Sequence, residues 1–238
     1  AAQQKKHESK SNRNLMTELD SWHAQVSEDI IEPERPIIDP HHHLWRMGTP
    51  YELEDLWADT KAGHNITGTV FIECGAEYRT DGPVALQPVG ETEYVVAQAK
   101  QARKGEVPGK PPILGIVSHA DLTLGAAVVD VLQAHQESAE GLLRGIRHST
   151  AFYPDPPAVD RYAGRVAELM LQPSFREGFA QLSSAGLSYD AWLLHTQITE
   201  LTDLARAFPD TTIILDHFGG PLGIGPYSGK QAELFPQW

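Results

Sequence analysis

The chain has 238 residues, of which 41% are hydrophobic and 21% charged, a composition typical of a globular protein with a sizeable core. Its formal net charge of −13 argues against non-specific binding to nucleic acid and to anionic membrane surfaces. No apolar stretch reaches about 18 residues, so we expect no transmembrane helix. The single cysteine, Cys74, excludes an internal disulfide and favours a reducing compartment, for which we expect the cytoplasm.

The beginning of the chain differs in composition from the rest. Residues 1–15 are rich in Gln, Lys and Ser, and they lack the apolar core of a signal peptide. We therefore expect residues 1–15 to be disordered or a non-native extension, and residues 16–238 to form a single domain. A short helix is predicted over residues 17–26 with Thr17 as its N-cap.

From residue 36 onward, short apolar β-branched runs alternate with helical patterns. The predicted strands are 37–43, 68–75, 112–121, 142–148, 187–195 and 211–220. The predicted helices are 51–62, 91–102, 124–136, 174–184 and 198–207. A nearly continuous apolar run such as 68–75 is typical of a parallel strand that is buried on both faces. This alternation predicts a parallel sheet, either doubly wound or closed as a (β/α)8 barrel.

The first predicted strand ends in three consecutive histidines. Side chains alternate along a strand, so His41 and His43 point the same way, with Asp39 on that face and His42 on the other. Two such imidazoles can bind one divalent metal ion. A histidine-rich loop and the remnant of a purification tag are the alternatives, but an apolar strand and Trp45 flank this run.

Chemically active residues also follow the other predicted strands. In both architectures the functional site lies at the carboxyl ends of the strands. In chain order these ends carry His41 and His43, Glu73 and Cys74, His119 and Asp121, Arg147 and His148, His195, and Asp216 and His217. Only a closed barrel brings all the strand ends around one axis, so it fits this pattern better than an open sheet. There is no G-x-S-x-G nucleophile elbow and no Walker loop.

Four segments of the sequence resemble the amidohydrolase superfamily, and more closely its amidohydrolase-2 branch of lactonase-like, metal-dependent hydrolases. The matching segments are 38–45, 145–147, 187–195 and 214–221. The resemblance implies a TIM-type barrel. It also implies a hydrolase in which activated water opens a lactone, or a related cyclic ester or amide, of a small carboxylated or sugar-acid substrate.

The resemblance further implies a metal centre. His41 and His43 match the metal pair of the first strand, and His195 and His217 match histidines that bind metal or polarise the substrate carbonyl. We therefore predict His195 and His217 as catalytic residues and all four histidines as metal ligands. The implied cofactor is a divalent metal, zinc first and manganese second, although catalysis without metal also occurs in lactonases of this kind.

Substrate binding is assigned to Arg147, His148 and Tyr78, because a guanidinium makes forked contacts with a carboxylate. The partner implied is a small-molecule substrate, and a homo-oligomer is compatible with the sequence.

The chain departs from the family pattern at its far end. Family barrels have eight strands, with an Asp after the eighth that serves as metal ligand and general base. We find six strands and no candidate for that Asp, so we expect a barrel truncated after the sixth strand. As written, this chain is expected to be inactive, and unstable without a partner. The alternatives are a metal-dependent decarboxylase of the same superfamily and an inactive barrel that acts as a binding or assembly module.

Overall fold

The computed structural model of the protein describes residue 18 and residues 21–103, 110–154 and 166–238. The chain divides into two compact units, residues 1–35 and 36–238. Residues 1–15, expected to be disordered, and Thr17, the predicted N-cap, lie outside the described residues, whereas Ser21 to His23 are helical as expected. Within the described ranges, no helix combines the length and apolarity that a bilayer crossing requires.

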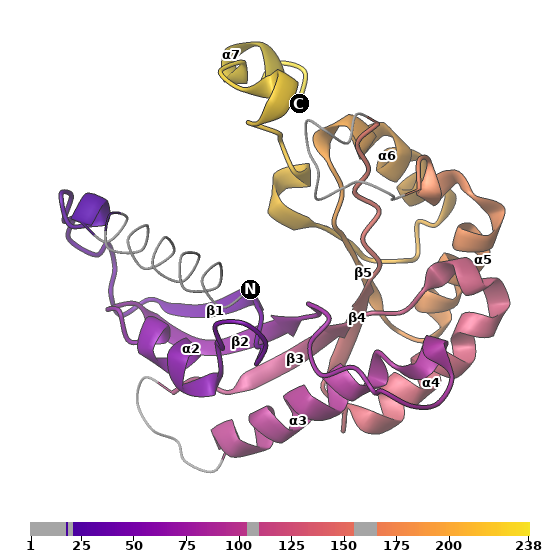
Figure 1. The fold of residues 1–238 in the computed structure, drawn as a ribbon, viewed down its shortest axis with the longest axis horizontal. Helices are drawn as coiled ribbons and strands as arrows, with labels where there is room; N and C mark the ends of the chain where they lie inside the picture. Colours follow the sequence, from indigo (N-terminus) through magenta and orange to yellow (C-terminus); the bar gives the residue numbers. More distant parts are fainter. Residues whose placement is uncertain (1–17, 19–20, 104–109, 155–165) are drawn as a thin grey trace, which may run out of the picture. The chain divides into compact units, whose positions relative to one another are not determined.

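The second unit contains one sheet of six parallel strands that follow each other in sequence order. The strands are β1 (Pro36–His42), β2 (Asn65–Ile72), β3 (Ile113–Ser118), β4 (Leu143–Arg147), β5 (Ser188–Ala191) and β6 (Ile213–Leu215). The sheet curls as part of a barrel wall does, and the long helices lie on its outer side (Figure 1). The predicted α/β fold with a barrel-type parallel sheet of six strands is therefore confirmed.

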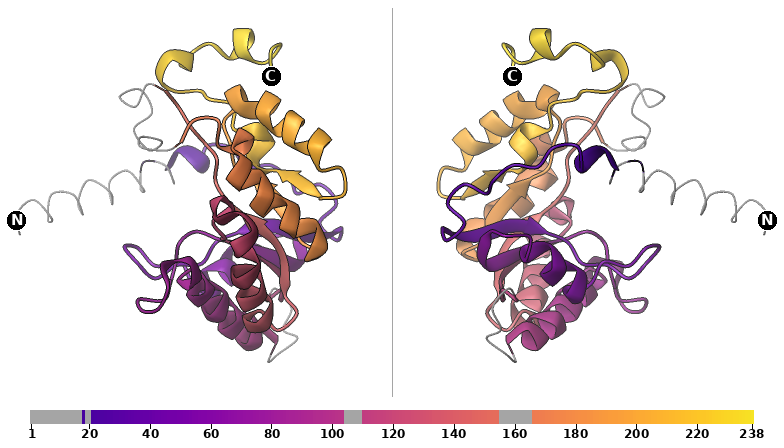
Figure 2. Two further views of the ribbon diagram at one scale, coloured as in Figure 1. Left: turned by 90° about the vertical axis from the view of Figure 1, so that its right-hand side faces the viewer. Right: turned by 90° about the vertical axis from the view of Figure 1, so that its left-hand side faces the viewer.

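Five helices cover the outer side, and a short sixth lies near the end of the chain. They are α2 (Leu53–Thr60), α3 (Val89–Arg103), α4 (Val128–Ser138), α5 (Pro173–Ser184), α6 (Ile198–Ala207) and α7 (Gln231–Leu234). Figure 2 shows α4, α5 and α6 in front of the sheet in its left view. The five predicted helices agree with α2 to α6 to within a few residues.

The fifth and sixth strands are shorter than predicted. His195 begins a 3-10 turn, because the Gln197 side chain turns back and accepts a hydrogen bond from the Leu194 N–H (3.3 Å). After β6 the backbone of His217 and Phe218 has positive φ angles of 49° and 56°, a left-handed conformation that cannot continue a strand. The apolar runs extend past both ends, which is why sequence patterns alone overestimate these two strands.

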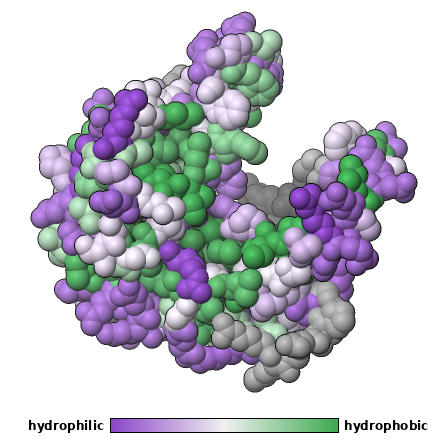
Figure 3. Space-filling view, turned by 180° about the vertical axis from the view of Figure 1, so that it is seen from behind, coloured by the Kyte–Doolittle hydropathy of each residue, from purple (hydrophilic) through white to green (hydrophobic). Residues whose placement is uncertain are grey.

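The two faces of the sheet have different surroundings. Phe71, Ile116, Ile146 and Tyr189 point to the helices and are fully buried. The other face lines a groove of about 460 Å³ with residues from β1 to β6, among them Asp190. Apolar strand side chains remain exposed at Ile38, Leu114, Ile214 and Leu215. Figure 3 shows that apolar side chains gather over much of one face of the molecule.

Close packing holds the loop after β3 in place. Helix α5 packs against the 3-10 segment Leu122–Ala127 at Gly178. A Cβ built on Gly178 would lie only 2.1 Å from the Leu122 carbonyl oxygen, so no larger residue fits without movement. This contact positions the segment that follows His119 and Asp121.

Candidate active site

Three imidazoles meet at the carboxyl ends of β1 and β6. The ring centroids of His41 and His43 are 5.0 Å apart, and those of His41 and His217 are 4.6 Å apart. The rings of His41 and His43 contact each other at the end of β1, whereas the ring of His42 packs against Phe71. We call His41, His43 and His217 the imidazole cluster. It borders the groove on the concave face of the sheet, which His41 and His217 both line.

The ring nitrogens of His41 and His43 are arranged differently. His43 Nδ1 lies 2.7 Å from the Ile72 carbonyl oxygen, which can only accept, so Nδ1 carries the proton and Nε2 keeps its lone pair. His41 Nε2 is buried and has no hydrogen-bond partner among the described residues. Burial, followed by the charges of His43, His217 and Arg147, lowers the pKa of His41 to about 3. Burial also lowers the pKa of His43, so both rings are neutral at pH 7.

Arg147 ties the ends of three strands together. Its Nε donates to Glu73 Oε1 (2.7 Å), its Nη2 donates to the Glu73 carbonyl, and its Nη1 donates to Asp216 Oδ2 (3.4 Å). Glu73 follows β2 and Asp216 follows β6, while Arg147 ends β4. The side chain of Arg147 is only 9% exposed. The guanidinium that the sequence assigns to a substrate carboxylate therefore has protein partners on all three of its nitrogens.

A second polar group lies beside Arg147, at the carboxyl ends of β3 and β4. The rings of His119 and His148 are 5.4 Å apart, and His119 Nδ1 donates to the Arg147 carbonyl (3.0 Å). His148 Nδ1 accepts the Leu122 N–H (3.1 Å) and lies 3.7 Å from Asp121 Oδ1.

A cavity of about 350 Å³ opens beside this group and is lined by Tyr78, His119 and Asp121 among others. We call it the side cavity. Tyr78 and His148, two of the predicted substrate-binding residues, thus lie on or next to the side cavity. The guanidinium of the third, Arg147, points to the imidazole cluster instead.

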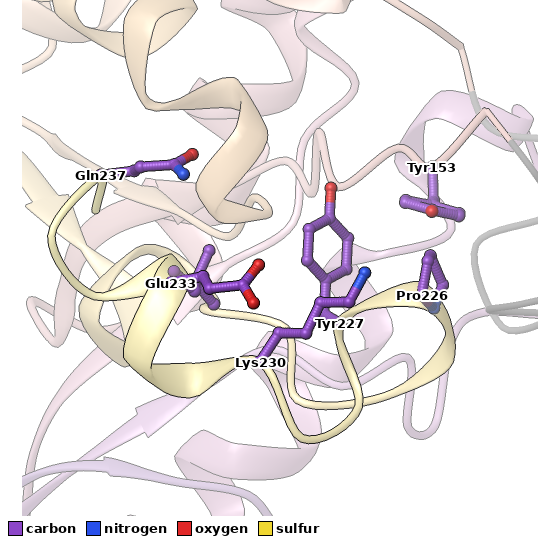
Figure 4. A pocket seen from close by; sticks show the side chains of 7 residues that line it. Tyr153, Pro226, Tyr227, Lys230, Glu233 and Gln237 are labelled. Carbon is purple, nitrogen blue, oxygen red and sulfur yellow. The ribbon is translucent and has the colours of Figure 1, made fainter.

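His195 makes its contacts elsewhere. Its ring lies edge-on to Tyr227 (4.9 Å), and its Nδ1 accepts the Leu222 N–H (3.4 Å). From the same segment, Trp192 instead of His195 contacts His217, with ring centroids 5.0 Å apart. Tyr227 also lines a cavity of about 260 Å³ with Tyr153, Lys230 and other residues (Figure 4). The structure thus brings His41, His43 and His217 together. His195, the fourth predicted metal ligand, contacts Leu222 and Tyr227 instead.

Sequence reasoning missed Asp190 as a site residue. Asp190 is buried in β5 and lines the same groove as His41 and His217. Burial and the nearby carboxylate of Asp216 raise the pKa of Asp190 to about 7. A charged residue type inside an apolar strand was the available signal, because a buried carboxyl group is rare without a task or a partner.

The imidazole cluster fits a metal centre in part. Neutral imidazoles are metal ligands, and an N–H to carbonyl hydrogen bond such as that of His43 is the usual support of a metal-bound histidine. A catalytic zinc ion takes three protein ligands. Within the described part of the chain, no three His, Cys, Asp or Glu side chains converge on a common metal position. His41 and His43 therefore supply a pair of ligands rather than a complete set.

Comparison with known proteins places the chain in a family. The family model called Amidohydrolase matches residues 38–236, which is most of the chain and includes the imidazole cluster. The chain belongs to the amidohydrolase family. A relative in Sinorhizobium fredii (strain NBRC 101917 / NGR234), the protein y4mH, is 33% identical over 206 residues, which are 77% of this chain and 62% of the relative.

Solved amidohydrolase structures share the fold. An amidohydrolase of Burkholderia multivorans with bound zinc superimposes with a TM-score of 0.52 at 20% identity, over 77% of this chain and 58% of that one. A Pseudomonas putida protein assigned as a 2-pyrone-4,6-dicarboxylic acid hydrolase gives a TM-score of 0.52 at 16% identity, over 84% of this chain and 62% of that one. The chain thus spans about three fifths of the length of these relatives.

Proposed function

We propose that the protein is a hydrolase that opens a lactone, or a related cyclic ester or amide, and that the imidazole cluster is its reaction centre. The observation that carries the proposal is the buried Nε2 of His41, which has no hydrogen-bond partner in the described residues, in a ring whose centroid lies 5.0 Å from that of His43. A buried polar atom without a partner is costly, and this one belongs to a group of three imidazoles at the ends of two strands, which favours a ligand there. Family membership supports hydrolysis, and a 2-pyrone, the substrate class named for the Pseudomonas putida protein, is a cyclic ester.

The residues of the cluster have separate tasks in this proposal. Arg147 holds Asp216 and Glu73, and Asp216 lies 3.9 Å from His41 Nδ1, so the guanidinium fixes the surroundings of the His41 ring. His217 is exposed on the groove side and donates a hydrogen bond to the carbonyl oxygen as negative charge develops on it. The positive charge of Arg147 is close enough to favour the same developing anion.

A divalent ion, zinc or manganese, held by His41 and His43 with His217 and His195 as further predicted ligands, would polarise the carbonyl and lower the pKa of bound water. The neutral state of His41 and His43 suits that role, because a protonated imidazole cannot bind a metal ion. The zinc ion in the Burkholderia multivorans relative supports this choice.

The test is a panel of lactones with a pH indicator, run on the full-length protein. We expect ring opening for at least one lactone, and a loss of kcat/KM of about 100-fold or more in His41→Ala and His43→Ala. His64→Ala removes an exposed histidine outside the cluster and is the matched control, with unchanged kinetics. Full activity in His43→Ala would remove the cluster from the mechanism, and release of carbon dioxide without ring opening would replace hydrolysis by decarboxylation.

A further inference from the structure

The side cavity has the size and the position of a binding site. Its volume of about 350 Å³ lies within the range of small-molecule pockets. It lies where the loop after β2 meets the 3-10 segment after β3. His119, which lines it, donates a hydrogen bond to the carbonyl of Arg147 and so connects the cavity to that residue. It is lined by Tyr78, Val84, Ala85, Gln87, Pro88, His119, Asp121 and Leu124.

One wall of the side cavity is apolar and accessible. Val84, Ala85, Pro88 and Leu124 form it, and Val84 and Leu124 are exposed. Such a wall takes the face of a ring or a short hydrocarbon chain, because burying apolar surface on both partners is favourable.

The opposite wall offers hydrogen-bond acceptors. His119 uses Nδ1–H for the Arg147 carbonyl, so Nε2 is the ring nitrogen that is left for a ligand. Asp121 Oδ1 accepts both the N–H (2.9 Å) and the hydroxyl (2.6 Å) of Thr123, which leaves Oδ2 for a ligand. Burial raises the pKa of Asp121, but the two Thr123 hydrogen bonds together with His148 and His119 lower it, and the net pKa is lowered, so the group is an anion at pH 7.

The cavity carries no positive charge to balance an anionic ligand. None of the described residues that line it is Lys or Arg. Arg79, next in sequence to Tyr78, pairs with Glu93, and Arg147, whose carbonyl bonds to His119, pairs with Glu73 and Asp216. A carboxylate placed in the cavity would therefore face Asp121 without a counter-charge.

We propose that the side cavity binds an uncharged, hydroxyl-bearing ring or short chain, whose O–H donates to His119 or Asp121, and that it rejects carboxylates. If the proposed function holds, this group is the non-reacting part of the substrate, and any acid group of the substrate lies outside the side cavity. Binding itself does not depend on turnover, so the two proposals fail separately: a protein that binds such a group but opens no lactone retains the cavity and loses the function.

The experiment compares benzyl alcohol with benzoate, which share a benzene ring but carry a hydroxyl group and a carboxylate, respectively. Both are titrated into the complete protein at pH 8, and binding is followed by the NMR shifts of the Leu124 and Val84 methyl groups. We expect benzyl alcohol to shift these methyl groups and to bind at least about tenfold more tightly than benzoate, as a like-charge penalty of roughly 1.4 kcal/mol gives. Equal or tighter binding of benzoate overturns the proposal, and so does the absence of any shift with benzyl alcohol.

Two substitutions sharpen the test. Leu124→Trp fills the cavity and should weaken benzyl alcohol binding at least tenfold, whereas Val129→Trp, at an exposed position on the adjoining helix α4, should leave it unchanged. Asp121→Asn removes the negative charge and should narrow the preference for the alcohol over benzoate. Identical behaviour of Leu124→Trp and Val129→Trp, or an unchanged preference in Asp121→Asn, contradicts the assignment. The comparison of the two ligands in the unmodified protein does not depend on the folding of any variant.

Discussion

Two groups of histidines lie at the same end of the sheet and differ in what their ring nitrogens contact. In the imidazole cluster, His41 Nε2 is buried and has no partner in the described residues. In the second group, as at His43, Nδ1 of His119 and of His148 takes part in a hydrogen bond with the backbone. Within the described residues, neither ring has a nitrogen that is both buried and without a partner. Behind them the fully buried His135 is bonded at both nitrogens, to the Thr92 hydroxyl (2.8 Å) and to the His119 carbonyl (2.9 Å).

This difference separates histidines that await a ligand from histidines that hold the structure. Residue type and position at a strand end are the same in both groups, so neither property distinguishes them. A ring nitrogen that is buried and unbonded does: within the described residues His41 has one at Nε2, and His119 and His148 have none. The predictions that follow disturb first the residue that links the two groups and then the second group alone.

The largest effect on stability is expected at Arg147, whose side chain bonds to Glu73 and to Asp216, the neighbour of His41, and whose carbonyl accepts a hydrogen bond from His119. Arg147→Met leaves the carboxylates of Glu73 and Asp216 without their cation, which should destabilise the protein by about 3–5 kcal/mol. Arg147→Lys keeps the positive charge but cannot make all the hydrogen bonds of the guanidinium, so we expect a smaller loss of stability than in Arg147→Met. Urea unfolding measures both, and an unchanged midpoint in Arg147→Met would show that the network contributes nothing to stability.

A pH-dependent effect is expected at His135. Burial lowers the pKa of His135 to about 4, against 6.5 for an exposed histidine. Between pH 6.5 and pH 4 the unfolded chain takes up a proton at this position and the folded protein does not, so stability falls as the pH falls. The contribution is about 3 kcal/mol over this window. In His135→Gln the difference in unfolding free energy from the unmodified protein should shrink by this amount as the pH falls from 6.5 to 4; a constant difference would mean that His135 titrates normally.

The smallest effect concerns the packing beneath the second group. Gly178→Ala places a methyl group against the Leu122 carbonyl, and the Leu122 N–H is the donor to His148. We expect a loss of about 1–3 kcal/mol. Movement of Leu122 should also change the NMR chemical shifts of the His148 ring, whereas those of His41 should stay the same. Ser183→Ala, at an exposed position of the same helix, is the control. A Gly178→Ala protein as stable as this control would show that the segment can move away at no cost.

The arrangement of the strands was predictable because it follows from local patterns. Alternating apolar runs and helical periods identify the six strands, and the curl of a barrel-type sheet brings together His41 and His217 at the ends of its two outermost strands. The partners of Arg147 were not predictable, since Glu73 is 74 residues away and nothing in the sequence shows that a protein carboxylate rather than a substrate occupies the guanidinium. The place of His195 was missed for a similar reason: Gln197 turns the chain by bonding to Leu194 and to the Thr150 carbonyl, which lies 47 residues from it in the sequence.

Zinc binding tests the central claim most directly. The complete protein and its His43→Ala and His119→Ala variants are freed of metal and titrated with zinc by calorimetry at pH 7.5. The account predicts that His43→Ala lowers the zinc affinity at least about tenfold, whereas His119→Ala, which changes a residue outside the imidazole cluster, binds zinc as the unmodified protein does. Equal zinc affinity of His43→Ala and the unmodified protein, or an equal loss in both variants, would contradict it.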